Sequence, residues 1–370
     1  MKFFDTYTSN CIAGSANQHV FYPEDSTKSY TGRIFYKIAN SGRFEHSLLF
    51  SNILDSTYSD GTKSHKNLIC DSWTIENALI ARCKMELPVG KAVETSPDFN
   101  NDVTGFLPIT FNGNRKKEVA PGEFFCCDPF KMTLEKGDYL CLEITFKGPQ
   151  IPYHEEIEIP TYKKTEEGWK YSRKVPVALM VGCKREVKTK VAYLGDSITQ
   201  GIGTPINSYK HWNSVLSELL GEENAYWNLG IGYGRANDAA TLGAWAFKAK
   251  QNDVLVICFG VNDIFRIRDS KTTCADIERL VDFFKALGKN VILQTVPPFG
   301  YRGEDLVRWN EINDYLCSTL SKKADLFFDV RPVLSGEKPQ DAKYGGHPNA
   351  EGSKLWAEAL YSAIKESGIL

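Results

Sequence analysis

Four short loops in the second half of the chain hold polar side chains of the types that catalysis uses. The first is Gly195-Asp196-Ser197, and it follows the apolar run 191–194. A serine on a tight turn after a buried strand can present its hydroxyl as a nucleophile, provided that a base lies within hydrogen-bond reach. An isolated Gly-Asp-Ser can equally place Asp196 or Ser197 as the cap of the next helix, so this loop alone leaves both roles open.

A histidine in the last of the four loops is the candidate base. His347 stands between Gly345-Gly346 and Pro348, at the entrance of an amphipathic segment, and the chain has only six histidines. Imidazole is the side chain that most often serves as a general base near neutral pH. A lone histidine is more often structural than catalytic, but the glycine pair and the proline favour a fixed loop position for this one.

The two loops between them can supply hydrogen-bond donors. The segment Gly230-Ile231-Gly232-Tyr233-Gly234 has three glycines in five residues, so its backbone N–H groups can come close to an anion. Its spacing matches neither G-x-x-x-x-G-K-[ST] nor G-x-G-x-x-G, the usual phosphate-binding loops. In Gly260-Val261-Asn262-Asp263, the Asn262 amide can donate a hydrogen bond, or Asn262 can be a turn residue.

The elements that must position these loops are the strands of a parallel sheet. Three runs are apolar throughout, as in strands buried on both faces: 191–194, 254–259 and 291–293. Three other segments repeat apolar residues at steps of three and four, which predicts amphipathic helices: 277–287, 309–320 and 355–363. Together they predict a flavodoxin-like doubly wound parallel sheet with α/β/α layers. Ligands of such sheets bind at the carboxyl ends of the strands, where these loops fall.

The first half of the chain has a different pattern. In 140–146 the even positions are apolar while Glu143 and Thr145 fall on the other face, which predicts a half-buried strand. Residues 81–85 alternate in the same way, and Pro and Gly separate such segments. This pattern predicts a β-sandwich of the jelly-roll type. We interpret the Pro-, Glu- and Lys-rich segment 147–190 as a connection, and expect an N-terminal β-sandwich domain at 1–187, connector included, and a second domain at 188–370.

Composition excludes several classes of protein. The hydrophobic share of 42% and the charged share of 24% are ordinary for a globular protein. A net charge of −2 gives the chain no bulk electrostatic reason to bind nucleic acid or an anionic membrane. No apolar run approaches the roughly 18–20 residues of a transmembrane helix. We therefore expect neither nucleic acid nor membrane as a partner, while the oligomeric state stays open.

The N-terminus and the cysteines favour a cytoplasmic location. The first residues include an Asp at position 5 and no sustained apolar stretch, unlike a signal peptide. The ten cysteines form no Cys-x-x-Cys pair, and the adjacent Cys126 and Cys127 are poor partners for each other. We expect reduced thiols.

Taken together, the four loops resemble the SGNH or GDSL-like hydrolases. The four blocks of that family stand here in order as Gly195-Asp196-Ser197, Asn228-x-Gly230, Gly260-x-Asn262-Asp263 and His347-Pro348. The resemblance covers essentially all of 190–370. The alternating first half is also similar to the N-terminal β-domain of two-domain members, among them carbohydrate esterases.

The resemblance implies ester hydrolysis through a covalent intermediate. It makes Ser197 the nucleophile and His347 the base. The oxyanion would be held by the Ser197 N–H, by a backbone N–H of the second block and by the Asn262 side chain. No metal and no organic cofactor are implied, and the partner is a small-molecule or carbohydrate ester.

Two positions depart from the family pattern. The family usually places an Asp three residues before the histidine, where this chain has Tyr344. Asp341, Asp329 at the end of the run 326–328, or a Ser–His dyad without an acid are the alternatives, and we slightly favour Asp341. In the second block, the family's donor glycine falls at Tyr233, so that Tyr233 or one of the neighbours Gly232 and Gly234 would complete the oxyanion hole.

The function expected from these residues is that of a serine esterase. It would remove small acyl groups, acetyl first among them, from a carbohydrate. The first alternative is a lipase- or thioesterase-like hydrolase of short acyl esters. The second, from a different class, is a catalytically silent carbohydrate-binding protein, which the two irregular positions suggest.

Overall fold

The chain forms two compact units in the computed structural model. The structure describes residues 2–12, 19–58, 64–95, 103, 105–155, 157–266, 268–335 and 343–370. Unit 1 comprises Met1–Asp55, His65–Val187 and Pro205–Ser208, and unit 2 comprises Ser56–Ser64, Lys188–Thr204 and Tyr209–Leu370.

The N-terminal part of the chain is built from antiparallel strands. They are β1 (Thr8–Ser9), β2 (His19–Phe21), β3 (Tyr30–Lys37), β4 (Gly42–Ser51), β5 (Ile53–Tyr58), β6 (Ser64–Ile69), β7 (Trp73–Cys83), β8 (Leu107–Pro108), β9 (Lys117–Val119), β10 (Phe124–Cys126), β11 (Phe130–Leu134), β12 (Tyr139–Lys147), β13 (Ile151–Tyr153), β14 (Thr161–Thr165), β15 (Gly168–Tyr171) and β16 (Met180–Cys183), with the short helices α1 (Phe3–Thr6) and η1 (Gly90–Glu94). One sheet has the order β1-β16-β4-β10, with β11 also on β4. A larger one has the order β15-β14-β3-β12-β7-β8, with β9 also on β7. The pairs β13-β2 and β5-β6 stand apart from both.

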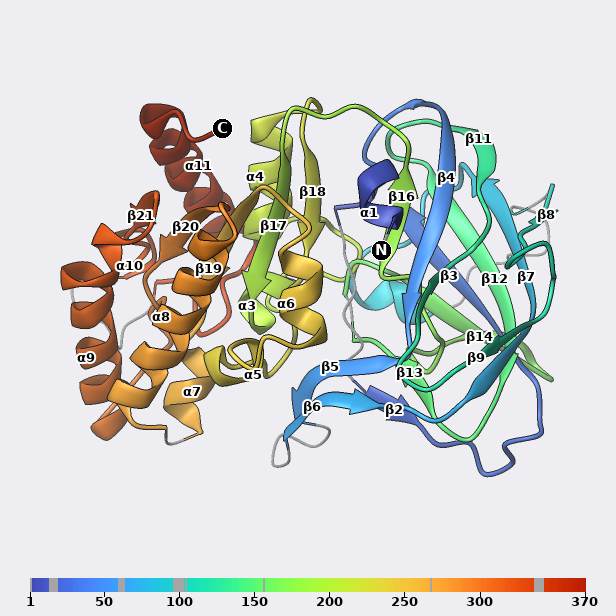
Figure 1. Cartoon of the computed structure of the whole chain (residues 1–370), viewed down its shortest axis with the longest axis horizontal. Coiled ribbons are helices and arrows are strands. Elements are labelled where there is room, and N and C mark those ends of the chain that lie inside the picture. Colours follow the sequence, from blue (N-terminus) through green and yellow to red (C-terminus); the bar gives the residue numbers. More distant parts are fainter. Residues whose placement is uncertain are drawn as a thin grey trace. The chain divides into compact units, whose positions relative to one another are not determined.

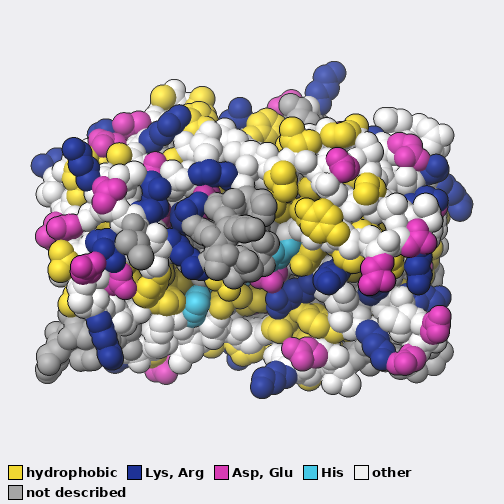
Figure 2. Space-filling view, turned by 90° about the horizontal axis from the view of Figure 1, so that it is seen from below, with side chains coloured by type: hydrophobic (Ala, Val, Ile, Leu, Met, Phe, Trp, Pro, Cys, Tyr) yellow, Lys and Arg dark blue, Asp and Glu magenta, His cyan; other side chains and the backbone are white. Residues whose placement is uncertain are grey.

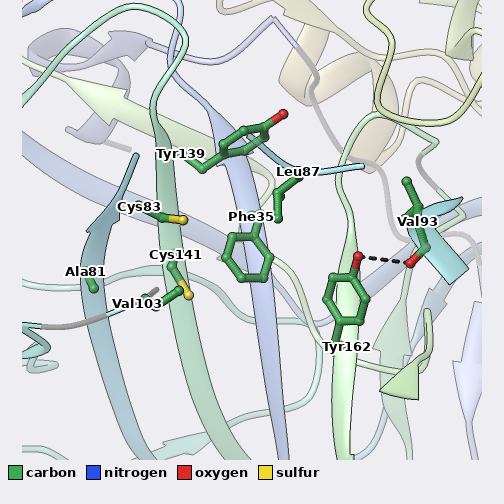
Figure 3. Close-up of a cluster of buried hydrophobic side chains, with 9 residues drawn as sticks. All are labelled: Phe35, Ala81, Cys83, Leu87, Val93, Val103, Tyr139, Cys141 and Tyr162. Carbon is green, nitrogen blue, oxygen red and sulfur yellow. Dashed lines mark hydrogen bonds between the residues drawn. The ribbon is translucent and has the colours of Figure 1, made fainter. Parts of the chain in front are cut away.

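Strand β12 shows how the sequence pattern becomes a core. Its even residues Leu140, Leu142, Ile144 and Phe146 are all fully buried, as alternation predicts. Cys141, on the opposite face, is fully buried as well. It belongs to a second cluster on that face, which Figure 3 shows: Phe35, Ala81, Cys83, Leu87, Val93, Val103, Tyr139, Cys141 and Tyr162. The centre of the larger sheet is therefore buried on both faces.

The segment that the sequence suggested as a connection contributes strands to both large sheets. Residues 161–171 form the hairpin β14–β15, which extends the larger sheet through β3. Strand β16 pairs with β4 and β1 in the other sheet. The Pro- and Lys-rich composition of this segment obscured the hairpin, because β15 is the edge strand of its sheet, where charged side chains are common, and β14 lies beside it.

Unit 2 contains a parallel sheet covered by helices (Figure 1). Its strands are β17 (Lys190–Gly195), β18 (Ala225–Asn228), β19 (Val254–Cys258), β20 (Asn290–Gln294) and β21 (Leu326–Phe328). Its helices are α3 (Ser197–Gln200), α4 (Trp212–Leu220), α5 (Ala236–Ala239), α6 (Ala244–Ala249), α7 (Val261–Phe265), α8 (Ser270–Ala286), α9 (Glu304–Ser318), η2 (Leu320–Lys322), α10 (Arg331–Leu334) and α11 (Ala350–Ser367). The strand order is β18-β17-β19-β20-β21, and every pairing is parallel. In chain order this reads 2-1-3-4-5, the order of doubly wound sheets of the flavodoxin type.

Buried aromatic residues hold the helices of unit 2 on the sheet. Trp212 of α4 stacks on Trp356 of α11, with ring centroids 4.9 Å apart, and both are fully buried. The Trp356 indole N–H donates to Gln294 Oε1 at the end of β20 (2.7 Å). Large aromatic rings supply most of the buried apolar area in such a layer, and each indole N–H needs a partner when it leaves water. The two helices are thereby anchored to the strand ends.

Two further features concern the cysteines and the helices. All ten cysteines carry free thiols. In the part of the chain that the structure describes, no helix combines the length and apolarity that crossing a bilayer needs.

Candidate active site

The first loop turns directly from strand β17 into helix α3. Asp196 is the N-cap: its carboxylate accepts a hydrogen bond from the Ile198 N–H (3.0 Å). A Cβ on Gly195 would lie 2.1 Å from Thr199 Oγ1 and 2.5 Å from the Cys258 carbonyl oxygen, so only glycine fits at this turn. Asp196 therefore takes the capping role that the sequence left open, and the Ser197 hydroxyl is released from it.

The Ser197 hydroxyl meets the imidazole of His347. Ser197 Oγ and His347 Nε2 are 2.9 Å apart, although 150 residues separate them in the sequence. His347 is partly buried, and this burial lowers the pKa of its imidazole below the ordinary value of 6.5. The ring is therefore neutral at physiological pH, the state in which Nε2 can accept the serine proton.

Packing contacts hold the His347 ring in place. The ring of Phe299 meets it in a T-shaped arrangement, with centroids 4.9 Å apart. On another side stands Gly203, where a Cβ would lie 2.8 Å from His347 Cβ and 2.6 Å from the Pro348 carbonyl oxygen. Sequence reasoning missed Phe299 and Gly203 because neither carries a reactive group. The only available signals were the glycines just after Ser197 and the position of Phe299 just beyond the strand β20.

The third member of a triad does not stand among the described residues. Asp341 lies outside the described residues. Asp329 follows β21, and its carboxylate accepts hydrogen bonds from the Thr295 hydroxyl (3.0 Å) and from the Arg331 guanidinium (2.7 and 2.8 Å). Within the described part of the chain, the one hydrogen-bond partner of the His347 ring is Ser197.

The second loop is tied to the first by a buried asparagine. Asn228, at the end of β18, donates from Nδ2 to the Thr199 carbonyl (3.0 Å), and its Oδ1 accepts from the Gly230 N–H (2.9 Å). A Cβ on Gly230 would lie 2.2 Å from the Gln200 nitrogen. Asn228 and Gly230 thus position the loop against α3.

Tyr233 occupies a backbone conformation that favours glycine. Its φ is +61°, and the turn around it is closed by the Gly234 N–H, which donates to the Ile231 carbonyl (3.0 Å). The N–H groups of Tyr233 and Ser197 have no acceptor among the described residues. The Gly234 N–H is already used, because it donates to the Ile231 carbonyl within the turn. Tyr233 therefore presents a donor in the geometry that a glycine would otherwise provide.

The third loop brings Asn262 to the second. Gly260, with φ of +129°, starts helix α7, and Asn262 Nδ2 donates to the Gly234 carbonyl (3.0 Å). This bond uses one of the two amide hydrogens, and the other is available to a ligand. Four sequence-predicted groups are thus carried by adjoining loops: the hydroxyl of Ser197, the imidazole of His347, the Tyr233 N–H and the Asn262 amide.

Two buried carboxyl groups lie behind these loops. Burial raises the pKa of Asp196 to about 7, and the nearby Asp263 adds to the rise. Burial likewise raises the pKa of Asp263 to about 6, although its Oδ2 accepts from the Ala236 N–H (3.0 Å). Both side chains make structural hydrogen bonds to backbone N–H groups, so we assign them a positioning role.

Two arginines near the second and third loops form ion pairs within the protein. Arg235 pairs with Asp238 (2.6 Å), and Arg268 pairs with Asp276 (2.5 Å). In the described ranges, no three His, Cys, Asp or Glu side chains come together in a way that could hold a metal ion.

Residues 193–355 match the GDSL-like lipase/acylhydrolase family. A search of curated proteins finds no match. Among solved structures, the chain is similar to a member of the lipolytic G-D-S-L family from Veillonella parvula (19% identity, 48% of this chain and 98% of that one, TM-score 0.40). It is also similar to a family two carbohydrate esterase from Clostridium thermocellum (14% identity, 96% and 100%, TM-score 0.40) and to an acetyl xylan esterase (20% identity, 47% and 99%, TM-score 0.40). The segment 193–355 contains Ser197, the Asn228 loop, Asn262 and His347. The chain thus carries a domain of the GDSL-like lipase/acylhydrolase family and is an ester hydrolase.

Proposed function

We propose that the protein is a serine esterase that removes small acyl groups, acetyl first among them, from a carbohydrate through an acyl-enzyme on Ser197. The observation that carries this proposal is the 2.9 Å distance between Ser197 Oγ and His347 Nε2. A serine hydroxyl is a weak nucleophile at neutral pH, and an imidazole at this distance can take its proton as the hydroxyl attacks.

In the first half of the reaction, Ser197 Oγ bonds to the carbonyl carbon of the ester while its proton moves to His347 Nε2. The carbonyl oxygen becomes an oxyanion. When the tetrahedral intermediate collapses, the bond to the alcohol oxygen breaks, and the imidazolium returns the proton to that oxygen. The alcohol leaves, and the acyl group stays on Ser197.

Three donors stabilise the oxyanion in this scheme: the Ser197 N–H, the Tyr233 N–H and the Asn262 amide. Tyr233 is preferred over Gly234 because the Gly234 N–H already donates to Ile231. Gly232 is the remaining alternative from the sequence. Donors fixed in advance stabilise the charge without reorganising, and losing one typically costs about 10²–10³ in rate.

Water completes the reaction. His347 Nε2 takes a proton from a water molecule, whose oxygen bonds to the acyl carbon. The bond to Ser197 Oγ then breaks, and the proton returns to Oγ as the acid leaves. The imidazole is held for both steps by Ser197, Phe299 and Gly203. Asp341 is the proposed carboxylate partner of a triad, and without it the pair works as a dyad.

Exposed rings in the same loops support a saccharide as the alcohol part. Tyr233 is 42% exposed, and the Arg266 guanidinium lies 5.9 Å from the centroid of its ring. Phe265, at the end of α7, is 40% exposed. Aromatic faces beside polar groups suit the C–H faces and hydroxyls of a sugar, whereas a long acyl chain needs a larger apolar surface.

The test compares wild type with Ser197→Ala on p-nitrophenyl acetate and on acetylated xylo-oligosaccharides. Ser362→Ala, on the exposed side of α11, is the matched control. We expect Ser197→Ala to lose activity on both substrates and Ser362→Ala to keep it. Equal rates for wild type and Ser197→Ala would refute Ser197 as the nucleophile. Labelling of wild type but not of Ser197→Ala by a fluorophosphonate would exclude a silent binding protein.

A hydrolase of longer acyl esters is the second candidate, and one observation favours it. Phe265 and Phe299 lie together, with centroids 5.5 Å apart, and Phe299 contacts the catalytic imidazole. These rings would form one wall of an acyl site. Rates on acetyl and octanoyl esters of the same alcohol separate the two proposals, since a preference for octanoyl would overturn the small-acyl proposal.

A further inference from the structure

Unit 1 has a groove of its own, formed by the edge of its larger sheet. Its volume is about 730 Å³. The loop before β3, the start of β3 and the hairpin β14–β15 form its walls. The lining residues are Lys28, Ser29, Tyr30, Thr31, Lys163, Lys164, Thr165, Glu166, Glu167 and Lys170.

Positive charge exceeds negative charge in this groove. Four lysines line it against two glutamates, and one of those glutamates, Glu167, pairs with Lys170. Among the described residues of the groove, the one ion pair is that of Glu167 with Lys170, while the charge of Lys28 also acts on the Asp25 carboxylate, whose pKa is lowered by hydrogen bonds from Thr27 and further by Lys28. Burial lowers the pKa of Lys163, and the like charges of Lys174 and Lys28 lower it further. These ammonium groups therefore lie close enough to repel one another, and an anion placed between them would be attracted by all of them.

The most buried of these cations is held by aromatic rings. Lys163 Nζ lies 3.9 Å from the ring centroid of Tyr30 and 4.8 Å from that of Phe21. Lys174 Nζ lies 5.6 Å from the Phe21 centroid. A ring face orients an ammonium group but leaves its net charge in place. The charge of Lys163 therefore remains available to a ligand.

The whole chain does not share this surplus of positive charge. Its net charge is −2. On the face that Figure 2 shows, basic side chains are interspersed with acidic ones. A nucleic-acid site usually needs a wide basic surface, because it neutralises many phosphates in a row. The hydroxyls of Ser29 and Thr165 already donate to Glu76 and to the Gly168 carbonyl, so their oxygens can only accept further hydrogen bonds. A groove with a local surplus of positive charge and with such acceptors suits a ligand that combines scattered negative charges with many hydroxyls.

We infer that this groove binds an anionic carbohydrate, a chain that bears carboxylate or sulfate groups, through Lys28, Lys163 and Lys164. Lysine ammonium groups bind such anions as point charges. The choice of a carbohydrate rests on the proposed function, while the binding itself is independent of Ser197. An acidic polysaccharide that carries acyl groups would then be both a ligand of the groove and a substrate of the proposed esterase.

The test measures binding of a short oligogalacturonate by calorimetry, with a neutral xylo-oligosaccharide and a single-stranded DNA of similar charge as the other ligands. The variant is the triple Lys28→Gln, Lys163→Gln, Lys164→Gln. The matched control replaces three exposed lysines elsewhere, Lys91, Lys131 and Lys365, by Gln, and so changes the net charge equally. Activity on p-nitrophenyl acetate and the unfolding midpoint show that both triple variants fold.

We expect wild type to bind oligogalacturonate, more weakly as salt is added, and to bind the neutral sugar less. The groove variant should bind about tenfold more weakly, because exposed ion pairs contribute modestly and three are lost. The control variant should bind like wild type. Equal affinity of the groove variant and the control, no binding of oligogalacturonate by wild type, or tighter binding of the DNA would each overturn the inference.

The design also separates this inference from the proposed function. Ser197→Ala should bind oligogalacturonate as wild type does, because the groove lies in unit 1. An inactive wild type that still binds oligogalacturonate in the groove would reject the esterase proposal alone. An active esterase whose groove variant binds like wild type would reject the groove alone.

Discussion

Replacing Gly203 by alanine should disable the proposed base without touching a reactive group. The new Cβ would lie 2.6 Å from the Pro348 carbonyl oxygen, 2.8 Å from His347 Cβ and 3.1 Å from the His347 carbonyl carbon. Two of these atoms are backbone, so the contact cannot be relieved by rotating a flexible side chain. The loop that carries His347 must move instead.

The required movement can be read from the same distances. Ordinary contact begins at 3.4 Å, so His347 Cβ must retreat by at least 0.6 Å from its distance of 2.8 Å. The Ser197–His347 hydrogen bond is 2.9 Å long, and a shift of that size takes it to the limit of a useful bond. A misplacement of about 1 Å in a catalytic group costs roughly 10²-fold in rate. We therefore expect kcat to fall about 10²-fold, or about 2.7 kcal/mol of transition-state stabilisation.

Backbone strain must be separated from this displacement. Gly203 has a φ of +107°, so alanine there also costs about 1–2 kcal/mol of folding stability. Gly168 has nearly the same φ, +112°, and a Cβ on it would meet no atom within 4 Å. Gly168→Ala is therefore the matched control, with a similar backbone strain and no contact with the base.

The assay is steady-state hydrolysis of p-nitrophenyl acetate, with thermal unfolding measured in parallel. Gly203→Ala should lose kcat with KM nearly unchanged, and its labelling by a fluorophosphonate should slow in proportion. Gly168→Ala should lose some stability and keep its kcat. A folded Gly203→Ala protein with kcat within about threefold of wild type would refute the idea that packing at this glycine positions the imidazole.

Four further predictions follow from the site and the core. Because burial lowers the pKa of His347 below 6.5 and the base must be neutral, kcat/KM should fall as pH drops, with a midpoint below 6.5; a profile flat to pH 4 would contradict the base. Tyr233→Gly should keep kcat within a few-fold, since it retains the N–H and accepts the φ of +61°, whereas a loss of about 10²-fold would assign the tyrosine side chain an essential role. Asp341→Asn should lower kcat by orders of magnitude if Asp341 completes a triad and have little effect if the pair is a dyad, with Asp325→Asn as the control. Burial lowers the pKa of His46 to about 4, so the unfolded chain binds a proton there more readily than the folded one, and the free energy of unfolding should fall by about 3 kcal/mol between pH 6.5 and pH 4. Denaturant unfolding at the two pH values should show a smaller fall for His46→Phe than for wild type, and an equal fall would contradict this origin.

The strands and helices of unit 2 were readable because their patterns are strong. The apolar run 254–259 forms β19 up to Cys258, and the stripe at 277–287 lies in α8 except for its last residue, the cap residue Leu287. A strand buried on both faces has a continuous apolar run, and a helix with one apolar face has a clear period. Strands at the edge of a sheet have weaker sequence patterns. Strands β14 and β15 carry Lys163 at a half-buried position and Lys164 and Lys170 at exposed positions, so their sequence was mistaken for a connection.

The candidate site, too, could be predicted from the sequence only in part. Short polar motifs with fixed neighbours, such as Gly-Asp-Ser, could be found from residue types alone. The roles within them could not, because each depends on which hydrogen bond a group has already made. Asp196 was separated from Ser197 as the helix cap only by its bond to Ile198. Asp329 was a candidate for the acid of the triad, but the structure shows that its carboxylate accepts hydrogen bonds from Thr295 and Arg331.

Tyr233 shows most clearly why a residue type can mislead where a backbone conformation does not. A family pattern that asks for glycine at this position asks for two things, a positive φ and an N–H with no other acceptor. Tyr233 has the φ of +61°, and its N–H has no acceptor in the described part of the chain. Gly234, which has the right residue type, donates its N–H to the turn. The turn around Tyr233 is closed between Ile231 and Gly234, and the Gly234 carbonyl accepts a hydrogen bond from Asn262. We therefore propose that Tyr233 can supply the donor of the second block, because an oxyanion interacts with an N–H group and not with the side chain behind it.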